Sequence, residues 1–461
     1  MHIYKQSILS LFVSSILATP LVYADTPEWV EKNTENAEGI ATFNKNIPTV
    51  ALSKVVVTAV LKEELEIAES AASISHFGAK EVERLNASSL NALLAFEPGV
   101  DADESTSGGL ENIRIRGVGD DKVLITVDGA PIPAAFEFGD YLATSGNYFD
   151  IDAMKSIDII KGPMSTLYGG SALAGGIFMQ TKDPSDFIKE GNRFGGEAKI
   201  GYNTASRETL YSGTAAGQFT DKLSAFVRAT YADGHERRNA FGKGSSSSVI
   251  GPDRKHPNPS DVDFHNILTK VVFEANENHR FSASYENFEE TVKTKPLSNL
   301  GTMKDALANE AKFHSMMNNP FIPDYVKAQV PSSAPVRLDS HIKNKNKREQ
   351  FTFRHDFDVQ TALFDRGFWN LYYQENKAQQ WSDEYRAIYF KDPSKPMIFA
   401  DRDRYSNYKN KSFGIGAEFN KGWEQNIHVF HNITYGLNYR EQKLSTTRYG
   451  DTIDRANNIS V

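Results

Sequence analysis

The sequence has no cysteine among its 461 residues, and its formal net charge is −8. The absence of cysteine excludes a disulfide-stapled scaffold, c-type haem attachment and thiolate ligation of a metal. The slightly acidic balance lacks the basic footprint of a nucleic-acid-binding protein. Beyond the N-terminus, no apolar run reaches the roughly 18 residues that a membrane-spanning helix needs.

Catalytic motifs are also missing. There is no His-x-x-x-His pair that would hold a metal, no Gly-x-Ser-x-Gly nucleophile turn and no phosphate-binding loop. An enzyme would have no residues from which to build its site, so we expect a protein without catalytic activity. For the same reason we expect no permanently bound cofactor.

The first 24 residues have the three parts of a secretory signal peptide. Lys5 supplies positive charge, residues 8–17 form a short apolar core, and residues 22–24 end a small-residue cleavage site. An anchored N-terminal helix is the alternative, but this apolar run is too short to span a bilayer. The pattern therefore predicts an exported protein whose mature chain begins near Asp25.

A short valine-rich segment follows a polar leader. Residues 25–53 show no clear hydrophobic period and predict a flexible segment. Residues 54–60 read Lys-Val-Val-Val-Thr-Ala-Val, in which five of the seven residues are β-branched. Such a segment can add to the edge of a partner's sheet. It can equally be the buried first strand of the next domain, and the pattern alone leaves both interpretations open.

The next part of the chain predicts a compact α+β domain over residues 64–187. Asn86-Ala-Ser-Ser, followed by three leucines and then Pro98-Gly99, predicts a capped helix with a defined end. Three runs rich in β-branched residues, each soon followed by Gly or Pro, predict strands. These runs are residues 113–116, 123–127 and 157–160. Alone, the stretch also suits an ordinary small soluble domain.

From about residue 195 the chain changes to segments of alternating polarity. Residues 223–231 carry an apolar set from Leu223 to Tyr231, while Ser224, Arg228 and Thr230 lie on the opposite face. Alternation with aromatic residues at segment ends predicts a transmembrane β-barrel, apolar toward lipid and polar toward the lumen. A secreted β-sandwich is the alternative, but its core would not tolerate the charges of the second face.

Nine strands are expected, with short and long links in alternation. Residues 237–263 and 295–345 are the long links, and both are expected on the outer side. Within the second, residues 303–319 predict a surface helix with Met303, Ala306, Leu307 and Ala311 on one side. The expected strands are residues 196–203, 208–219, 223–234, 264–275, 280–293, 348–363, 367–387, 404–420 and 427–447.

Together these features resemble the TonB-dependent outer-membrane receptors. Residues 55–59 are similar to the TonB box of that family, and four motifs match its plug signatures in order and spacing. The motifs are residues 113–117 (Ile-Arg-Ile-Arg-Gly), 127–129 (Val-Asp-Gly), 159–163 (Ile-Ile-Lys-Gly-Pro) and 167–169 (Leu-Tyr-Gly). The resemblance implies a mainly β protein: an N-terminal α+β plug inside an antiparallel transmembrane β-barrel of about 22 strands. About nine of these strands would be present here.

A narrower resemblance is to the branch of the family that takes haem or iron from haemoglobin, transferrin and lactoferrin. The segments that carry it are residues 170–176, 180–187, 202–209, 215–219 and 233–239. Two departures stand against it. Haem receptors often have a His at the plug apex, but residues 131–149 contain Tyr141 and Tyr148 and no His. The FRAP and NPDL motifs are absent as well, so direct axial ligation of haem is unsupported.

The resemblance also implies partners and a location. TonB, with its inner-membrane energising complex, would bind the valine-rich segment, and lipid of the Gram-negative outer membrane would surround the barrel. A haem protein such as haemoglobin, or another iron carrier, would bind outside, and haem or ferric iron would be the transported ligand. The TonB-binding residues would be Val55, Val56, Val57, Thr58 and Ala59.

Candidate ligand contacts are the two apical tyrosines, Tyr141 and Tyr148, and three loop histidines, His235, His256 and His314. Any histidine can bind haem iron, although a solvated surface position is the commoner role of a single loop histidine.

Other polar residues are expected to have structural roles. His355 and His431 fall on the outward register of their strands, and His76 belongs to the periplasmic part of the plug. Arg114 and Arg116 are expected to pair with carboxylates at the boundary of plug and barrel, where a structural and a gating role are equally open.

The expected domains are a signal peptide (1–24), a periplasmic leader (25–63) with the TonB box (54–60), a plug (64–187) and the first part of a barrel (193–461). Nine strands are too few to enclose the plug, so a fragment or a truncated reading frame is expected, and a truncated product would not transport. A ferric-siderophore receptor and a surface adhesin remain alternatives, since the former differs only in its loops and the latter needs no TonB box.

Overall fold

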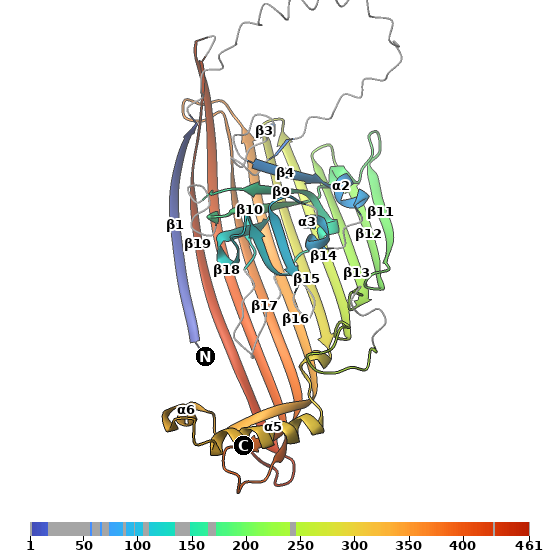
Figure 1. The fold of residues 1–461 in the computed structure, drawn as a ribbon. Coiled ribbons are helices and arrows are strands. Elements are labelled where there is room, and N and C mark those ends of the chain that lie inside the picture. The colour runs from blue at the N-terminus through green and yellow to red at the C-terminus, as the bar shows by residue number, and fades with distance from the viewer. Residues whose placement is uncertain are drawn as a thin grey trace, which may run out of the picture.

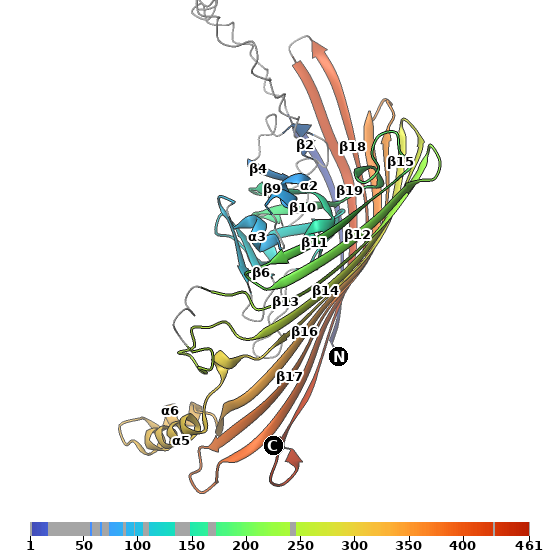
Figure 2. The ribbon, with the colours of Figure 1, turned by 90° about the vertical axis from the view of Figure 1, so that its right-hand side faces the viewer.

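The structure is a computed structural model of the chain. It describes residues 2–16, 56–57, 65–66, 73–85, 89–95, 97–104, 110–133, 148–164, 172–239, 246–426 and 429–460. Two bodies make up these residues: a large curved sheet and a small plug domain that lies against one face of it (Figures 1 and 2).

Nine consecutive strands, each antiparallel to the next, form the curved sheet. All nine strands expected from the sequence are present in the expected order, which confirms the mainly β fold with a plug and an incomplete barrel wall. The strands are β11 (Phe194–Asn203), β12 (Glu208–Gln218), β13 (Leu223–His235), β14 (Ser260–Asn276), β15 (His279–Thr294), β16 (Ser333–Asp358), β17 (Arg366–Phe390), β18 (Ile398–Asn426) and β19 (Val429–Asp454).

A tenth strand covers the far edge of the sheet. Residues of β1 (His2–Ile16), the segment expected to be a signal peptide, pair antiparallel with β19, from His2 opposite Thr446 to Ile16 opposite Asn432. An exposed strand edge presents a row of unpaired N–H and C=O groups, so any extended segment that pairs there is stabilised. The two-residue strand β20 (Ile459–Ser460) also pairs with β19.

The two faces of the sheet differ as the alternating pattern predicted. On β13, Phe226, Arg228 and Thr230 are almost fully buried on the face toward the plug, whereas Val227 and Tyr231 are 47% and 45% exposed on the other face. The outer face is thus apolar and uncovered, and the inner face is polar and covered.

The later strands are longer than expected. The structure starts β16 at Ser333 rather than at residue 348, so the second long link is shorter than predicted and ends at residue 332. In the added stretch Lys343, Lys345 and Lys347 alternate with Asn344 and Asn346, so both faces are polar and the period of a strand is hidden. Strand β18 likewise starts at Ile398, and β19 runs on to Asp454.

The expected surface helix is present as α5 (Met303–Asn318), followed by the short α6 (Asp324–Gln329). Ala306 alone of the predicted apolar side is buried, and it packs against the extended parts of β16 and β17; Met303 and Leu307 are exposed. No helix among the described residues is both long and apolar enough to cross a bilayer.

The plug is built on a five-stranded sheet in the order β4-β9-β10-β7-β8. Its only parallel pair among these strands is β10 with β7. The expected strands and the capped helix are confirmed: Ser89 accepts a hydrogen bond from the backbone N–H of Ala92, 3.2 Å away. The elements are β4 (Ser73–Gly78), α2 (Ala79–Arg84), α3 (Leu90–Leu94), β5 (Val100–Glu104), β6 (Leu110–Ile115), β7 (Val123–Val127), β8 (Ala130–Pro131), β9 (Met154–Lys161) and β10 (Gly175–Thr181).

Isoleucines from adjacent plug strands form a dry core. Ile115, Ile157, Ile159 and Ile177 are completely buried. Gly175 lets β10 pass close to β9, since a Cβ at this position would lie 2.1 Å from the carbonyl oxygen of Ile160 and the backbone has a φ of +133°. The plug is therefore a packed body in its own right, bounded on one side by the curved sheet.

Candidate functional site: the interface between plug and sheet

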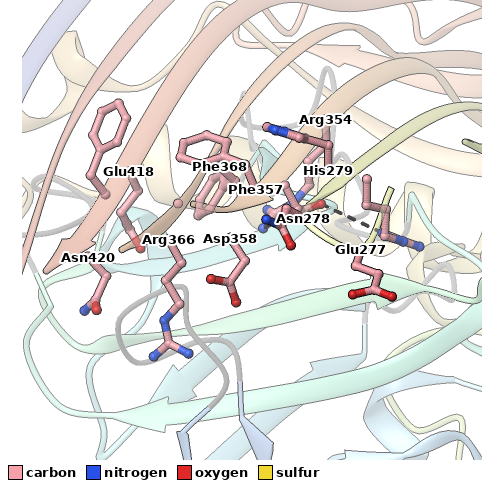
Figure 3. Close-up of a pocket in the computed structure, with 14 residues that line it drawn as sticks. Glu277, Asn278, His279, Arg354, Phe357, Asp358, Arg366, Phe368, Glu418 and Asn420 are labelled. Carbon is pink, nitrogen blue, oxygen red and sulfur yellow. Dashed lines mark hydrogen bonds and ion pairs between the residues drawn. The ribbon is translucent and has the colours of Figure 1, made fainter. Parts of the chain in front are cut away.

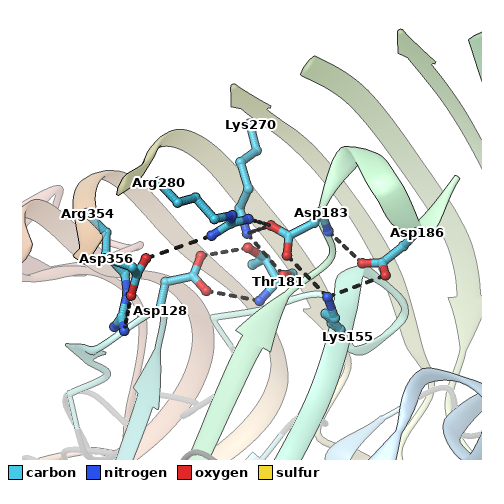
Figure 4. Close-up of polar contacts among 9 residues, drawn as sticks. All are labelled: Asp128, Lys155, Thr181, Asp183, Asp186, Lys270, Arg280, Arg354 and Asp356. Atoms are coloured by element: carbon cyan, nitrogen blue, oxygen red, sulfur yellow. Dashed lines mark hydrogen bonds and ion pairs between the residues drawn. The ribbon is translucent and has the colours of Figure 1, made fainter. Parts of the chain in front are cut away.

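A partly buried aspartate joins the plug to the sheet just after β10. Asp183 accepts hydrogen bonds at 3.2 Å from Lys270 of β14 and Lys155 of β9, and Arg280 of β15 lies at the same distance (Figure 4). Lys155 also pairs with Asp186 at 3.5 Å. One carboxylate thus connects two sheet strands with the plug's own β9.

The same cluster holds the end of β10. Lys270 donates to the carbonyl oxygen of Thr181 at 3.0 Å, and the Thr181 hydroxyl donates to Asp128 at 2.6 Å. Asp128 also accepts from the Thr181 backbone N–H at 3.0 Å. The last plug strand is therefore fixed from both sides before the chain enters the barrel wall.

The charges of this cluster reinforce one another. Burial alone would raise the pKa of Asp183, but the cations of Lys270, Arg280 and Lys155 outweigh it and hold that pKa well below its ordinary 3.8. Burial would lower the pKa of Lys155, yet Asp183 and Asp186 raise it above 10.5. Both groups stay ionised throughout the neutral range.

A second ionic contact lies deeper in the interface. The fully buried guanidinium of Arg228 on β13 pairs with Asp152 of the plug and donates to Thr214 and Ser212, each at 2.9 Å. Asp152 also accepts from Lys199 of β11 at 2.7 Å. Asp152 is thus held by cations from two strands of the sheet.

Further along the sheet, the plug backbone is bound by amide side chains. Gln350 of β16 donates to the carbonyl of Val127 at 3.1 Å, and Gln374 of β17 donates to that of Pro131 at 2.8 Å. Beside Gln350, the buried Arg348 pairs with Glu286. The contact is largely polar from β11 to β17. Its apolar part among the described residues lies where Ala216, Phe226 and Leu268 join the plug core, with the Phe187 and Phe226 rings 5.2 Å apart.

A polar cavity of about 280 Å³ adjoins this interface on the inner face of the sheet (Figure 3). It is connected to the aspartate cluster through Arg280, which lies 3.8 Å from Asp356. Arg354 stacks over the Phe368 ring at 3.7 Å. Other charged residues of the lining are Glu277, Asp358, Arg366 and Glu418. Water in this cavity would reach the ion pairs from the side where the short turns lie.

The candidate ligand contacts lie apart from one another. Tyr148 is 1% exposed in the plug core, where burial raises its pKa, so in this conformation it faces no outside ligand. Tyr141 lies outside the described residues. His314 on α5 is hydrogen-bonded to the carbonyl of Phe390 at 2.8 Å, and His235 to Asp261 at 2.9 Å. His256 is half-buried in the link between β13 and β14.

Among the described residues, no group of three or more histidines and carboxylates is placed to hold a metal ion. In the same outer region Arg254, a loop cation by sequence, donates to the carbonyls of Val249 at 2.7 Å and Pro257 at 2.8 Å. Its guanidinium therefore shapes the loop.

The valine-rich segment is described only at Val56 and Val57. These form β2 (Val56–Val57), which pairs antiparallel with β3 (Leu65–Glu66). Val55, Thr58 and Ala59 lie outside the described residues. A hairpin of two residues a side is marginal, so a competing strand would displace it readily.

Two expectations for the arginines and histidines are refined. Arg114 pairs with a carboxylate, but the partner is Asp103 of the plug's own hairpin at 2.5 Å, not a residue at the boundary with the barrel. His76 lies at the β4 end of the plug and contacts Asp158 at 2.6 Å. His355 stacks on Phe281 at 4.1 Å, and His431 on Trp423 at 5.0 Å. Both stacks lie on the outer face of the sheet.

The ionic contacts of the interface have no direct signal in the sequence. Asp183 and Lys270 are far apart in the chain, and only the fold brings them together. The one usable sign was a charge on the inward register of a strand, as at Arg228, because such a charge must find a partner when the face is covered.

Comparison with known proteins agrees with this architecture. Residues 66–176 match the family model of the TonB-dependent receptor plug domain. The solved FpvAI–pyocin S2 complex superposes with a TM-score of 0.51 at 12% identity, covering 87% of this chain and 44% of that one. Pseudomonas aeruginosa FpvA bound to pyoverdines gives 0.51 at 13% identity, with coverage of 86% and 45%. The likeness to both structures concerns the fold.

Residues 66–176 therefore carry the plug domain of the TonB-dependent receptors, and the similar proteins together support a receptor of that family. Within that family the chain is similar to Haemophilus influenzae haemoglobin-binding protein A, at 26% identity over 67% of this chain and 29% of the relative. It is also similar to haemoglobin and haemoglobin-haptoglobin-binding protein C of the same species, at 29% identity over 50% and 23%. The chain thus spans less than a third of these relatives.

Proposed function

We propose that the chain is the N-terminal part of a receptor for TonB-dependent uptake of haem or iron from haem proteins such as haemoglobin. The observation that carries the proposal is a compact plug held against a barrel wall by buried ion pairs, with a short strand-former on its N-terminal side. The names of the two Haemophilus influenzae relatives support haemoglobin as the ligand.

The energy for uptake would come through the valine-rich segment. A plugged barrel does not leak, so moving cargo past the plug requires work on the plug. Pairing of residues 55–59 with a strand of TonB would give a handle of several backbone hydrogen bonds. Because β2 and β3 pair over only two residues, TonB would take up the segment at small cost.

The polar interface fits a plug that moves. Separating two apolar surfaces in water carries a penalty in proportion to their area, whereas separated charges are rehydrated. The ion pairs of Asp183 and Asp152 with the sheet would hold the plug at rest. They would exchange for water when it is pulled, while the isoleucine core keeps the plug intact.

The domain assignments belong to the same proposal: a signal peptide over residues 1–24, a leader over 25–63, a plug over 64–187 and barrel strands over 193–461. Cleavage after residue 24 would remove β1 and leave the edge of β19 for another strand. N-terminal sequencing of the exported protein tests this, since an intact Met1 in the membrane fraction would contradict it.

Deletion of residues 54–60 tests the function. We expect the purified variant to lose binding to the periplasmic domain of TonB and to keep the parent's binding of haemoglobin. Deleting seven leader residues upstream, 40–46, is the matched control and should change neither. TonB binding that survives the 54–60 deletion would overturn the proposed handle.

A ferric-siderophore receptor is the second candidate, because the fold is shared with a structure of FpvA bound to pyoverdines. Binding of haemoglobin and of ferric pyoverdine to the full chain, measured side by side, separates the two. Saturable binding of the siderophore alone would replace haemoglobin as the ligand. A surface adhesin would bind its ligand without any response to TonB.

A further inference from the structure

The face of the sheet that carries the plug continues outward beyond it. Strands β16, β17 and β18 run on from the level of the plug toward the end with α5 (Figure 1). On β17, Gln374 binds the plug, and Glu384 follows on the same face, roughly 33 Å further at about 3.3 Å per residue. Glu384 is thus placed outward of the plug, where a ligand from outside would arrive first.

Three arginines share the single carboxylate of Glu384. Arg404 of β18 donates to one of its oxygens at 2.7 Å, Arg386 of β17 pairs with the other, and Arg337 of β16 lies 3.4 Å away. The side chains of Glu384, Arg386 and Arg404 are only 2%, 6% and 8% exposed. One negative charge thus stands against three positive charges in a place with little water, where an excess of one sign is costly.

The register of the strands adds a fourth arginine to this group. Arg402 of β18 lies directly opposite Glu384, and Arg337 lies directly opposite Arg386. Like charges at directly opposed positions destabilise a sheet. The second carboxylate on this face of β16 to β19 from Ser382 outward is Asp454 of β19, so four arginines stand against two carboxylates. We define the arginine cluster as Arg337, Arg386, Arg402 and Arg404.

Further carboxylates at this level lie on the other face of the same strands. Asp383, Asp403 and Asp451 stand directly opposite one another on β17, β18 and β19. Successive side chains of a strand point to opposite faces, so this acidic row is turned away from the arginine cluster. The two faces therefore carry opposite charge, and the positive excess remains on the side of the plug.

We propose that the arginine cluster binds the two propionate carboxylates of haem before the haem reaches the plug. A guanidinium presents a planar fork of N–H donors that fits a carboxylate. The side chain of Arg337 is 27% exposed and Arg402 is half-buried, so these two arginines contact the ligand. Arg386 and Arg404, which are more deeply buried, keep Glu384 paired and hold the strands together.

Recognition through the propionates fits the placement of the histidines. His314 is hydrogen-bonded to the carbonyl of Phe390 and His235 to Asp261, and the described residues contain no group of three or more histidines and carboxylates placed to hold a metal ion. Haem carries its carboxylates on one edge of the porphyrin, so arginines can bind that edge without a ligand to the iron. The inference rests on the proposed uptake of haem and names contacts that this function would use.

The test uses the full chain in a neutral detergent, with haemin and haemin dimethyl ester as probes and empty micelles as the blank. The ester keeps the iron and the porphyrin but has no free carboxylate. R337Q/R402Q should bind haemin at least about tenfold more weakly than the parent, because charge-assisted contacts with the carboxylates are lost. The matched control, R84Q/R193Q, removes the same charge at exposed positions outside the cluster and should bind haemin like the parent.

The ester distinguishes lost contacts from a damaged sheet. It should bind the parent more weakly than haemin does, and R337Q/R402Q should not weaken it further, since it lacks the groups that the arginines bind. R337K/R402K keeps the charge and should bind haemin more tightly than the glutamine variant does.

Three results would overturn the inference: equal binding of haemin and its ester to the parent, full haemin binding by R337Q/R402Q, or an equal loss for both probes in that variant. Haemoglobin binding, measured on the same samples, reports the proposed function separately. A parent that binds haemoglobin and gives any of these three results would keep the proposed function and lose the propionate site.

Discussion

The inside of the plug and its boundary with the sheet are built from different chemistry. Four isoleucines that are completely buried lie in the core of the plug. At the boundary, ion pairs of aspartates with arginines and lysines join the plug to the sheet, beside a small apolar contact at Phe226 and Leu268. When two apolar surfaces separate in water, the free energy gained from their contact is lost. When two ions separate, hydration by water replaces much of their attraction. The difference predicts one body that stays folded and one boundary that opens.

The largest effect is expected where the boundary contains a fully buried cation. In Glu286→Gln the guanidinium of Arg348 loses its counter-charge in a site without solvent. Breaking a buried pair from one side costs about 3–5 kcal/mol. Chemical unfolding of the refolded chain should show this loss, and Glu289→Gln, which affects a more exposed pair, is the control. A midpoint equal to the parent's would mean that water reaches Arg348.

A core substitution should rank next. Ile159→Ala removes side-chain atoms from a site with no exposure, and such truncations cost about 3 kcal/mol. Amide exchange should accelerate throughout β9 and β10 while the curved sheet keeps its protection. Ile200→Ala, on the exposed outer face, is the matched control. Protection that falls only at the boundary would contradict the idea of a rigid plug.

Asp183→Asn should loosen the boundary without unfolding the plug. Its charge-assisted contacts with Lys270, Lys155 and Arg280 weaken, at a cost of about 2 kcal/mol. We expect faster exchange at the end of β10 and unchanged exchange at Ile157. The opposite pattern would place the weak point inside the plug.

Acid should mimic that substitution. The folded-state pKa of Asp183 lies below its ordinary 3.8, so the ionised form stabilises the folded state at every pH above that value. The contribution decreases below pH 3.8 and is lost once pH falls through the lowered folded-state pKa. The contribution of Asp183 to the boundary should therefore be insensitive to pH between 5 and 8. A transition within that range would mean that a group other than Asp183 governs the pH dependence of the boundary.

The smallest effect is expected far from the plug. Thr302 caps α5 by accepting from the Asp305 backbone N–H at 3.1 Å, and Asp305 returns a bond to the Thr302 N–H at 2.7 Å. Thr302→Ala should cost about 1 kcal/mol of local stability. Limited proteolysis of α5 should accelerate while the boundary of the plug is unaffected. Faster exchange at β10 in this variant would reveal a coupling that the contacts do not show.

Much of the architecture could be predicted from the sequence, because one buried and one exposed face leave a period of two in each strand. The prediction failed at residues 333–347, where the covered face of β16 carries polar residues such as Ser340 and Asn346, so the alternation of apolar and polar residues disappears. The ion pairs of the boundary could not be predicted, since the distance in sequence between Asp152 and Arg228 carries no information about their contact. Tyr148 looked like an apical residue, but its ring completes the plug core.

The lengths of the strands have a consequence for how a large ligand meets the receptor. On β13 the strand ends at His235, only roughly 13 Å past Tyr231 at about 3.3 Å per residue. On β17 it runs from Tyr373 to Phe390, roughly 55 Å by the same measure. The edge of the sheet at this end therefore extends much further on β17 than on β13. A large ligand that approached from this end would contact the long strands, with α5 and α6 beside them, before it reached the plug.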